Sequence, residues 1–218
     1  MDLALLTDTL PTEQRLALAY TPARARAAVL ALLALDQRLA TLVRDAREPV
    51  LGQIKLAWWR DQLGKAADER PKGEPLLRLI GSWGDQGTVL AGLVDGWELA
   101  LDGVLAPAEV IAGLAQGRAR AAAALAVLLG HGGAAEEAAR AAHGWTLAAF
   151  AESGGQTADD TGLAQLLAAQ DWRPVRLPRD LRALTVLFGL ARMAQGTRPL
   201  LSGPRAGLSA IRLGLLGI

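Results

Sequence analysis

The sequence has no cysteine, few aromatic residues and almost no net charge. Without cysteine there is no disulfide framework and no thiolate chemistry, which fits a reducing compartment. Aromatic residues make up only 4% of the chain, and alanine and leucine are far commoner than valine and isoleucine. Alanine and leucine favour helices, whereas strands favour β-branched and aromatic residues. The composition therefore predicts an all-α protein with closely packed helices.

The charge is nearly balanced, with 23 basic and 22 acidic residues and a formal net charge of +1. This balance argues against a nucleic-acid partner, which needs a basic surface. Residues 1–5 lack the pattern of a secretion signal, and the longest apolar run, Ala27 to Leu35, is far shorter than a bilayer requires. We expect a cytoplasmic protein. A mean hydropathy of +0.23 leaves open peripheral contact with the inner face of a membrane.

Helical periodicity dominates the chain, and proline and glycine mark the breaks between segments. No repeat or domain boundary is visible, so residues 1–218 are interpreted as one helical bundle. The tail after the last expected helix has no clear pattern. The expected helices are 12–19, 23–47, 50–68, 75–83, 88–101, 107–129, 134–151, 160–169 and 181–195.

The most distinctive stretch is EPVLGQIKLAWWRDQL, from Glu48 to Leu63, in which two tryptophans precede an Arg-Asp pair. Together with the segment Ala19–Asp36, it resembles the squalene/phytoene synthase family, whose members carry a pattern like Glu-Pro-x-Leu-Gly-x-Ile-x-Leu-x-Trp-Trp-Arg-Asp/Glu-x-Leu. The resemblance is strongest at 19–63. It extends more loosely over about 10–200, through Leu93-Val94-Asp95, Gly162-Leu163-Ala164 and Val175-Arg176-Leu177-Pro178. It implies the all-α isoprenoid synthase fold.

Enzymes of that family join two prenyl diphosphates, using magnesium ions held by two aspartate-rich helices that face a hydrophobic cavity. Hard cations such as Mg²⁺ prefer oxygen ligands, and the metal stabilises the departing diphosphate. This chain departs from the pattern. The first aspartate-rich motif falls on Ala40, Thr41 and Arg44, and only Asp171 is acidic where the second should follow. The resemblance therefore implies the scaffold without most of its metal ligands.

Two functions remain open. The leading hypothesis is a catalytically degenerate family member that binds a lipid or prenyl ligand or assists assembly, as in the family's branch of complex I assembly factors. No cofactor is expected in that case, and the partner is either a prenyl or other lipid ligand or a protein. The alternative is an active Mg²⁺-dependent prenyltransferase of the squalene or phytoene synthase type, with metal ligands drawn from Asp36, Asp45, Asp95 and Asp171.

Several residues are candidates for a cavity or a diphosphate site. Aromatic faces suit apolar chains and carbocations, so Tyr20, Trp58 and Trp59 are candidates for a cavity lining. Core packing is the favoured interpretation of the tryptophans, because adjacent helical residues point about 100° apart and at most one should face a cavity.

The charged candidates also have two interpretations each. Lys55, Arg60 and Asp61 form either an anion site or, more simply, a solvated helix face with ion pairs. Asp36 lies on an apolar helix face, so it is either a polar remnant of the cavity or the partner of an arginine such as Arg60. Asp159 and Asp160 are interpreted as helix caps, and the spacing of His131 and His143 does not predict a zinc site.

Overall fold

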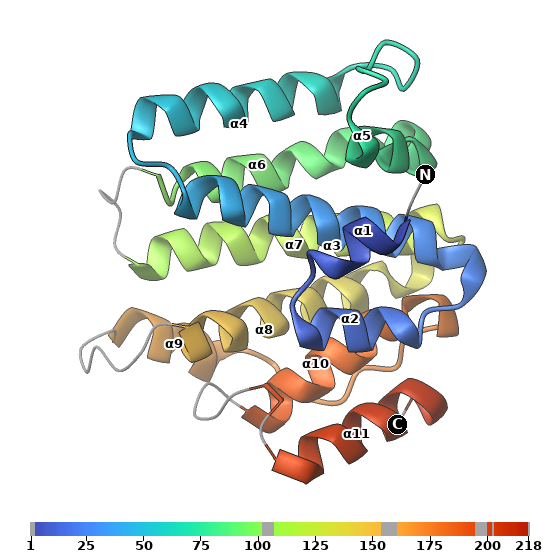
Figure 1. The fold of residues 1–218 in the computed structure, drawn as a ribbon. Helices are drawn as coiled ribbons and strands as arrows, with labels where there is room; N and C mark the ends of the chain where they lie inside the picture. The colour runs from blue at the N-terminus through green and yellow to red at the C-terminus, as the bar shows by residue number, and fades with distance from the viewer. Residues whose placement is uncertain (1–2, 102–106, 154–160, 195–199, 202, 218) are drawn as a thin grey trace.

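The computed structural model describes residues 3–101, 107–153, 161–194, 200–201 and 203–217, and these residues contain helices and no strands. Figure 1 shows the helices stacked in layers. At the top, α4 (Pro49–Gly64) covers α6 (Ala91–Glu98), beside α5 (Pro75–Ile80) and the 3₁₀ segment η1 (Gly81–Leu90). The long helices α3 (Ala23–Arg44) and α7 (Pro107–Leu128) form the centre, with α1 (Leu3–Asp8) against α3.

Below the centre, α8 (Ala135–Ser153) packs between α7 and α10 (Arg182–Ala194). The short helix α9 (Thr161–Ala169) contacts α7 and α8, and α2 (Thr12–Ala19) contacts α10. The last helix, α11 (Gly203–Leu216), lies at the bottom on α10 and α2 (Figure 1). Short 3₁₀ turns, η2 (Gly132–Ala134) and η3 (Arg179–Leu181), precede α8 and α10. The helices α4 and α11 are therefore the two outer layers of the stack.

Local sequence signals explain most helix ends. Pro22 directly precedes α3, and Pro49 occupies the first turn of α4, where a missing N–H costs nothing. The end of α7 is a Schellman motif, in which His131 N donates to Ala126 O at 2.8 Å and Gly130 N donates to Val127 O at 3.0 Å. Gly130 has φ +80°, a conformation that glycine adopts without strain. This turn reverses the chain so that α7 and α8 pack side by side.

Most of the core is a cluster of buried apolar side chains that runs from Leu6 in α1 to Ala210 in α11, and Ile111, Ala115 and Leu147 form a smaller second cluster. Small residues allow its helices to approach closely: a Cβ on Gly117 of α7 would lie 2.6 Å from Gly92 O of α6. The fully buried Trp83 donates its indole N–H to Ala28 O at 3.0 Å, which ties η1 to α3. Core packing and hydrogen bonding together fix the relative positions of the central helices.

The expectation of an all-α bundle is confirmed, and Thr12–Ala19 is reproduced to the residue. The sequence did not predict the two terminal helices: residues 3–8 form α1, and the tail without a clear pattern forms α11. Helix α3 stops at Arg44, before Arg47, and the expected 75–83 helix continues as 3₁₀ turns. The interpretation of Asp159 and Asp160 lies outside the described residues.

Helix α7 carries a stretch, Ala108–Leu128, that is long and apolar enough to cross a membrane by length and composition alone. In the described structure 61% of that window is buried inside the bundle, where α7 packs on α6 and α8. A mostly buried core helix meets the same criterion of length and composition. The burial of α7 therefore accounts for its composition.

Candidate functional site

A pocket of about 540 Å³ lies between α3 and α4 and collects several of the residues singled out by the sequence. Lys55, Trp58 and Trp59 line it from α4, and Thr41 and Asp45 line it from the end of α3. The family resemblance places the first aspartate-rich motif at Thr41 and its neighbours. The pocket is therefore next to the first motif, but its lining mixes both signs of charge and does not concentrate carboxylates.

The two tryptophans play different parts in this pocket. Trp59 is 4% exposed and belongs to the core, whereas Trp58 is 40% exposed. Their rings meet edge to face, with centroids 5.2 Å apart and planes at 85°. Both rings contribute to the pocket lining, so the expectation that at most one would do so was wrong. The edge-to-face contact explains this, because it allows a buried and an exposed ring to meet at one surface.

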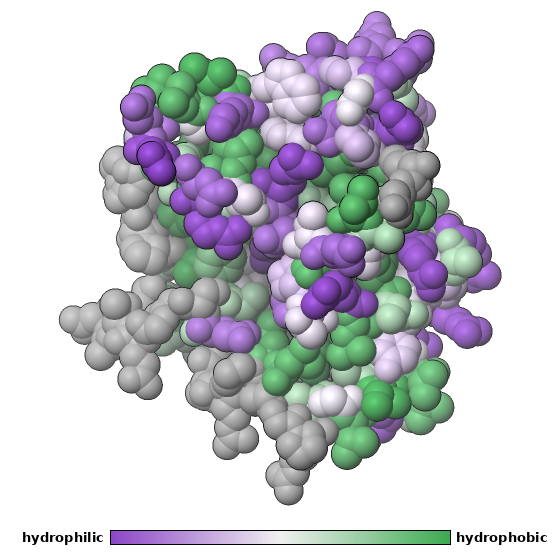
Figure 2. All heavy atoms as spheres, viewed as in Figure 1, coloured by the Kyte–Doolittle hydropathy of each residue, from purple (hydrophilic) through white to green (hydrophobic). Residues whose placement is uncertain are grey.

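Helix α4 also presents an apolar face to solvent. Val50, Leu51, Ile54 and Trp58 are all exposed, and their spacing of three and four residues places them on one side of the helix. In Figure 2 this face contributes to the green area at the upper left, where Figure 1 shows the start of α4. We call these four residues the α4 apolar face. It continues into the pocket through Ile54 and Trp58.

The opposite side of α4 is held by ion pairs to α6. Arg60 donates to Asp95 at 2.7 Å and to Glu98 at 2.5 Å. The hydrogen bonds that Arg60 donates to Glu98 and Asp95 raise the pKa of Arg60 above its ordinary value. Arg60 and Asp95 thus join two helices, while Asp61 is exposed on the surface of α4.

The end of α4 is capped by an arginine that the sequence did not single out. Arg70 is buried and donates to the backbone carbonyls of Gln62, Leu63 and Lys65 at 3.0 to 3.2 Å. These carbonyls lack helical partners at a C-terminus, and a cation there also complements the helix dipole. Burial lowers the pKa of Arg70 below its ordinary value. Arg70, which follows α4 in the chain, therefore fixes the C-terminal end of that helix.

Asp36 lies at the centre of the bundle, 3% exposed, and is fully partnered. Arg118 of α7 binds it through Nη2 to Oδ2 at 2.7 Å and Nε to Oδ1 at 3.1 Å. The indole N–H of Trp97 donates to Asp36 Oδ1 at 2.9 Å. The suggested partner, Arg60, was wrong, because Arg60 lies on α4 and is engaged by α6.

Aromatic rings surround the other side of the Arg118 guanidinium. Its Cζ lies 4.9 Å from the ring centroid of Trp145, and 5.8 Å from those of Trp97 and Phe150. Such contacts between a cation and aromatic faces compensate part of the desolvation of a buried arginine. Helices α3, α6, α7 and α8 thus meet around one ion pair. We call these five residues the Asp36–Arg118 cluster: Asp36, Trp97, Arg118, Trp145 and Phe150.

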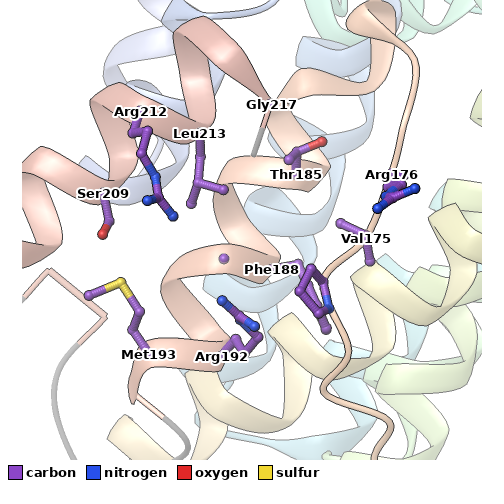
Figure 3. Close-up of a pocket in the computed structure, with 12 residues that line it drawn as sticks. Val175, Arg176, Thr185, Phe188, Arg192, Met193, Ser209, Arg212, Leu213 and Gly217 are labelled. Atoms are coloured by element: carbon purple, nitrogen blue, oxygen red, sulfur yellow. The ribbon is translucent and has the colours of Figure 1, made fainter.

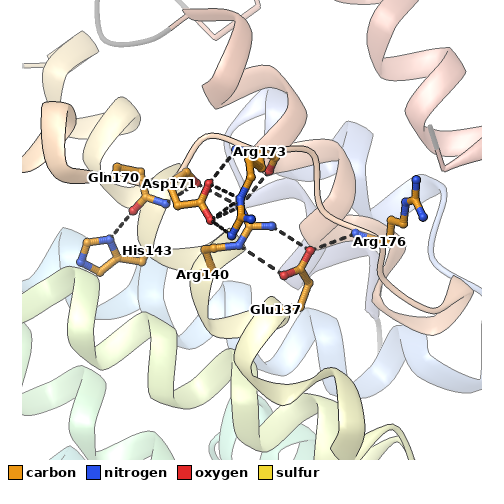
Figure 4. A network of polar contacts seen from close by, with 7 residues as sticks. All are labelled: Glu137, Arg140, His143, Gln170, Asp171, Arg173 and Arg176. Carbon is orange, nitrogen blue, oxygen red and sulfur yellow. Dashed lines mark hydrogen bonds and ion pairs between the residues drawn. The ribbon is translucent and has the colours of Figure 1, made fainter.

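Asp171, the only acidic residue near the second motif position, belongs to a separate network (Figure 4). Its carboxylate accepts from Arg173 Nη2 at 2.7 Å and from Arg173 N at 2.9 Å. The side-chain and backbone hydrogen bonds from Arg173 lower the pKa of Asp171 from 3.8 to about 2. Arg140 of α8, itself bound to Glu137, donates to Asp171 O and Arg173 O. The network fastens the segment after α9 to α8.

The contacts of three further candidates, Tyr20, Asp45 and His131, are as follows. The ring of Tyr20 lies directly over Gly214 of α11, where an added Cβ would come within 2.3 Å of it. Asp45 is exposed at the end of α3, with Arg44 at 4.0 Å. His131 Nε2 contacts Asp180 Oδ2 at 2.9 Å.

The four carboxylates proposed as metal ligands do not fit a magnesium site. Asp36 is bound by Arg118, Asp95 by Arg60, and Asp171 by Arg173. A guanidinium in contact with each of these three carboxylates repels a cation and occupies the oxygens that the cation needs. Across the described residues, no group of three or more histidine, cysteine or acidic side chains is arranged to hold a metal. Asp36, Asp95 and Asp171 are thus held in separate ion pairs, whereas Asp45 is exposed at the end of α3.

The all-α bundle is consistent with the isoprenoid synthase fold that the sequence resemblance implied. Residues 12–96 match the model of the squalene/phytoene synthase family. This range includes α4 and, from the Asp36–Arg118 cluster, Asp36 alone. The match confirms the family resemblance for that part of the chain. No curated protein matches the chain significantly, and neither does any solved structure.

Proposed function

We propose that this protein is a non-catalytic relative of squalene/phytoene synthases that acts by binding another protein, as an assembly factor does. The Asp36–Arg118 cluster is the observation that carries the proposal. It places an ion pair and three aromatic rings where helices α3, α6, α7 and α8 meet, and its carboxylate is neutralised. A prenyltransferase needs the opposite arrangement, with free carboxylates beside an apolar space.

The pocket beside α4 supports a protein partner. The α4 apolar face is bordered by charges of both signs, because Arg38 and Lys55 line the pocket together with Asp45 and Glu74. Arg38 and Glu74 form an ion pair at 3.7 Å. An apolar centre with a polar rim of mixed charge is the usual composition of a protein interface. An exposed indole such as Trp58 is also a typical anchor residue.

The first experiment tests the absence of catalysis. The purified protein is incubated with farnesyl or geranylgeranyl diphosphate and Mg²⁺, and diphosphate release is measured with and without a chelator. We expect no release above the protein-free rate. Release that a chelator abolishes would overturn the proposal in favour of the active prenyltransferase.

The second experiment tests the α4 apolar face. A photo-crosslinking amino acid at Val50 should trap a discrete partner in the native host, and Trp58→Ser should abolish the product. Val127→Ser, which alters an equally exposed apolar residue on α7, should leave it unchanged. Crosslinking only to lipid, or equal yields in both variants, would contradict a protein partner at this face.

A further inference from the structure

A second pocket, of about 480 Å³, lies at the opposite end of the molecule between α10, α11 and the segment 174–176 (Figure 3). None of the residues discussed for the α4 pocket contributes to it. Its volume falls within the range of about 300–1,000 Å³ that is common for small-molecule sites. It is therefore large enough for a ligand of its own.

The charged side chains that line this pocket are all cationic. Arg176, Arg192 and Arg212 contribute to the lining, and no aspartate or glutamate does. Within the described part of the chain, none of these three guanidinium groups has a carboxylate within 4.0 Å. Other arginines of this protein, such as Arg60 and Arg118, are paired with carboxylates. Among the described residues that line it, the pocket thus gathers three cationic side chains and no acidic one.

A buried hydroxyl in the lining also lacks a partner. Thr185 is 1% exposed, lines the pocket, and its Oγ1 makes no hydrogen bond. A threonine inside a helix normally donates to the carbonyl four residues earlier, as Thr146 does to Ala142 O at 2.8 Å. Leaving a buried hydroxyl unpaired is unfavourable by about 1–3 kcal/mol. A ligand oxygen that displaced the side chains now covering this hydroxyl would supply the missing partner.

The remaining lining is apolar. Val175 and Phe188 are buried, and Leu213 and Met193 complete the walls from α11 and α10. Figure 3 shows Arg192 and Arg212 toward the α11 side of this space and Arg176 on the other side, beyond Phe188. The cationic groups therefore border an apolar surface.

We propose that the pocket between α10 and α11 binds an amphiphilic anion, a molecule with a phosphate or carboxylate head and an apolar chain. Guanidinium groups bind such heads through charge-assisted, often bidentate hydrogen bonds. The apolar walls take up the chain, and the Thr185 hydroxyl donates to an oxygen of the ligand. This proposal is independent of the proposed function at α4.

The docking of α11 creates the site. Leu213 packs directly on Gly189 of α10, where an added Cβ would come within 2.2 Å of the leucine. The outer side of α11 carries Leu208, Ile211 and Leu215 exposed to solvent. An amphipathic helix of this kind favours a lipid surface. The anion can therefore be a free amphiphile or a lipid within a membrane, and the experiment separates the two sources.

Binding is tested by calorimetry with dodecyl phosphate below its micellar concentration, using the full chain. We expect saturable binding at one site, and much weaker binding of dodecanol and of inorganic phosphate, which each offer half of the recognised chemistry. Arg192→Gln and Arg212→Gln should each weaken binding about tenfold or more, as expected for a lost charge-assisted contact. Arg120→Gln, an exposed arginine on α7, is the control with the same change of charge and should bind like the wild type.

Thr185→Val distinguishes a role of the hydroxyl in ligand binding from a role in the stability of the fold. It keeps the shape but removes the hydroxyl, so binding should weaken while the thermal stability without ligand stays equal or rises. Competition by vesicles that contain phosphatidic acid assigns the source to a membrane, and lack of competition assigns it to a free amphiphile. The proposal is overturned if dodecyl phosphate does not saturate, if dodecanol or inorganic phosphate binds equally well, or if the Arg192 and Arg212 variants match the Arg120 control.

Discussion

Replacing Arg118 by methionine tests whether the Asp36–Arg118 cluster is structural. The change leaves the Asp36 carboxylate buried with only the Trp97 indole as a partner. Removing one member of a buried ion pair typically costs about 3–5 kcal/mol. The change also removes the contacts with the rings of Trp145 and Phe150. We therefore expect Arg118→Met to lose at least about 3 kcal/mol of unfolding free energy.

In a domain of this size each kcal/mol corresponds to about 2–4 °C, so the melting temperature should fall by roughly 6–20 °C. The assay is urea and thermal unfolding followed by circular dichroism. The double variant Asp36→Leu/Arg118→Met removes both charges and should recover most of the loss, since well-packed apolar pairs replace buried ion pairs at little cost. Strong non-additivity in this cycle is the expected signature of a direct interaction.

The same cycle separates structure from catalysis. Removing a residue kept for function commonly stabilises a protein, because active sites are strained or unpaired. Asp36→Leu alone leaves Arg118 buried without its carboxylate, so we expect it to destabilise the fold. A loss below about 1 kcal/mol for Arg118→Met, or additive effects in the cycle, would refute the assignment. A gain in stability for Asp36→Leu would point instead to a retained functional carboxylate.

Three further changes have definite expected outcomes. The pKa of Asp171 is lowered to about 2. Burial alone would raise the pKa of Asp180, but the hydrogen bonds that it accepts from Arg24 and His131 lower this pKa overall. Both carboxylates therefore stabilise the fold above their unfolded pKa near 3.8. Stability should therefore fall between about pH 4 and pH 2, and a urea midpoint that stays constant there would contradict this. Arg70→Met should cost about 1–3 kcal/mol and speed amide exchange at the end of α4, since three carbonyls lose a buried donor. Gly189→Leu should displace Leu213, so limited proteolysis should cleave within α11 well before the other helices; equal cleavage rates would argue against the docking of α11.

Sequence reasoning succeeded where structure is decided locally. Pro11, Pro22 and Gly130 mark helix ends that the structure reproduces, because these residues restrict or permit particular backbone angles. The Trp58-Trp59 signature indicated the family, and the family match covers it. Helix α11 was missed because its glycines and proline weaken the helical signal, and its position depends on contacts with Gly189 and Tyr20.

The polar contacts were harder to foresee. Arg118 and Asp36 are 82 positions apart, and nothing in the alanine-rich sequence around Arg118 distinguishes it from Arg120, which is exposed. The useful signal was the apolar helix face around Asp36, which correctly required a partner but did not identify it. Which arginine pairs with Asp36 depends on how α3 packs against α7, and a single sequence does not show which residues of the two helices lie close together. The cationic pocket was missed for the same reason, since its walls come from α10, α11 and the chain before them.

The two pockets differ in a way that assigns them different kinds of ligand. The lining beside α4 combines basic and acidic residues, so its charges are compensated internally and a charged small molecule gains little there. The charged residues that line the pocket beside α11 are all cationic, so that pocket favours an anion. The bundle centre between them is occupied by the Asp36–Arg118 cluster, in which Arg118 and the Trp97 indole bind the Asp36 carboxylate. Binding is therefore expected at the two outer helices, where apolar side chains remain exposed, with a protein at α4 and an amphiphilic anion at α11.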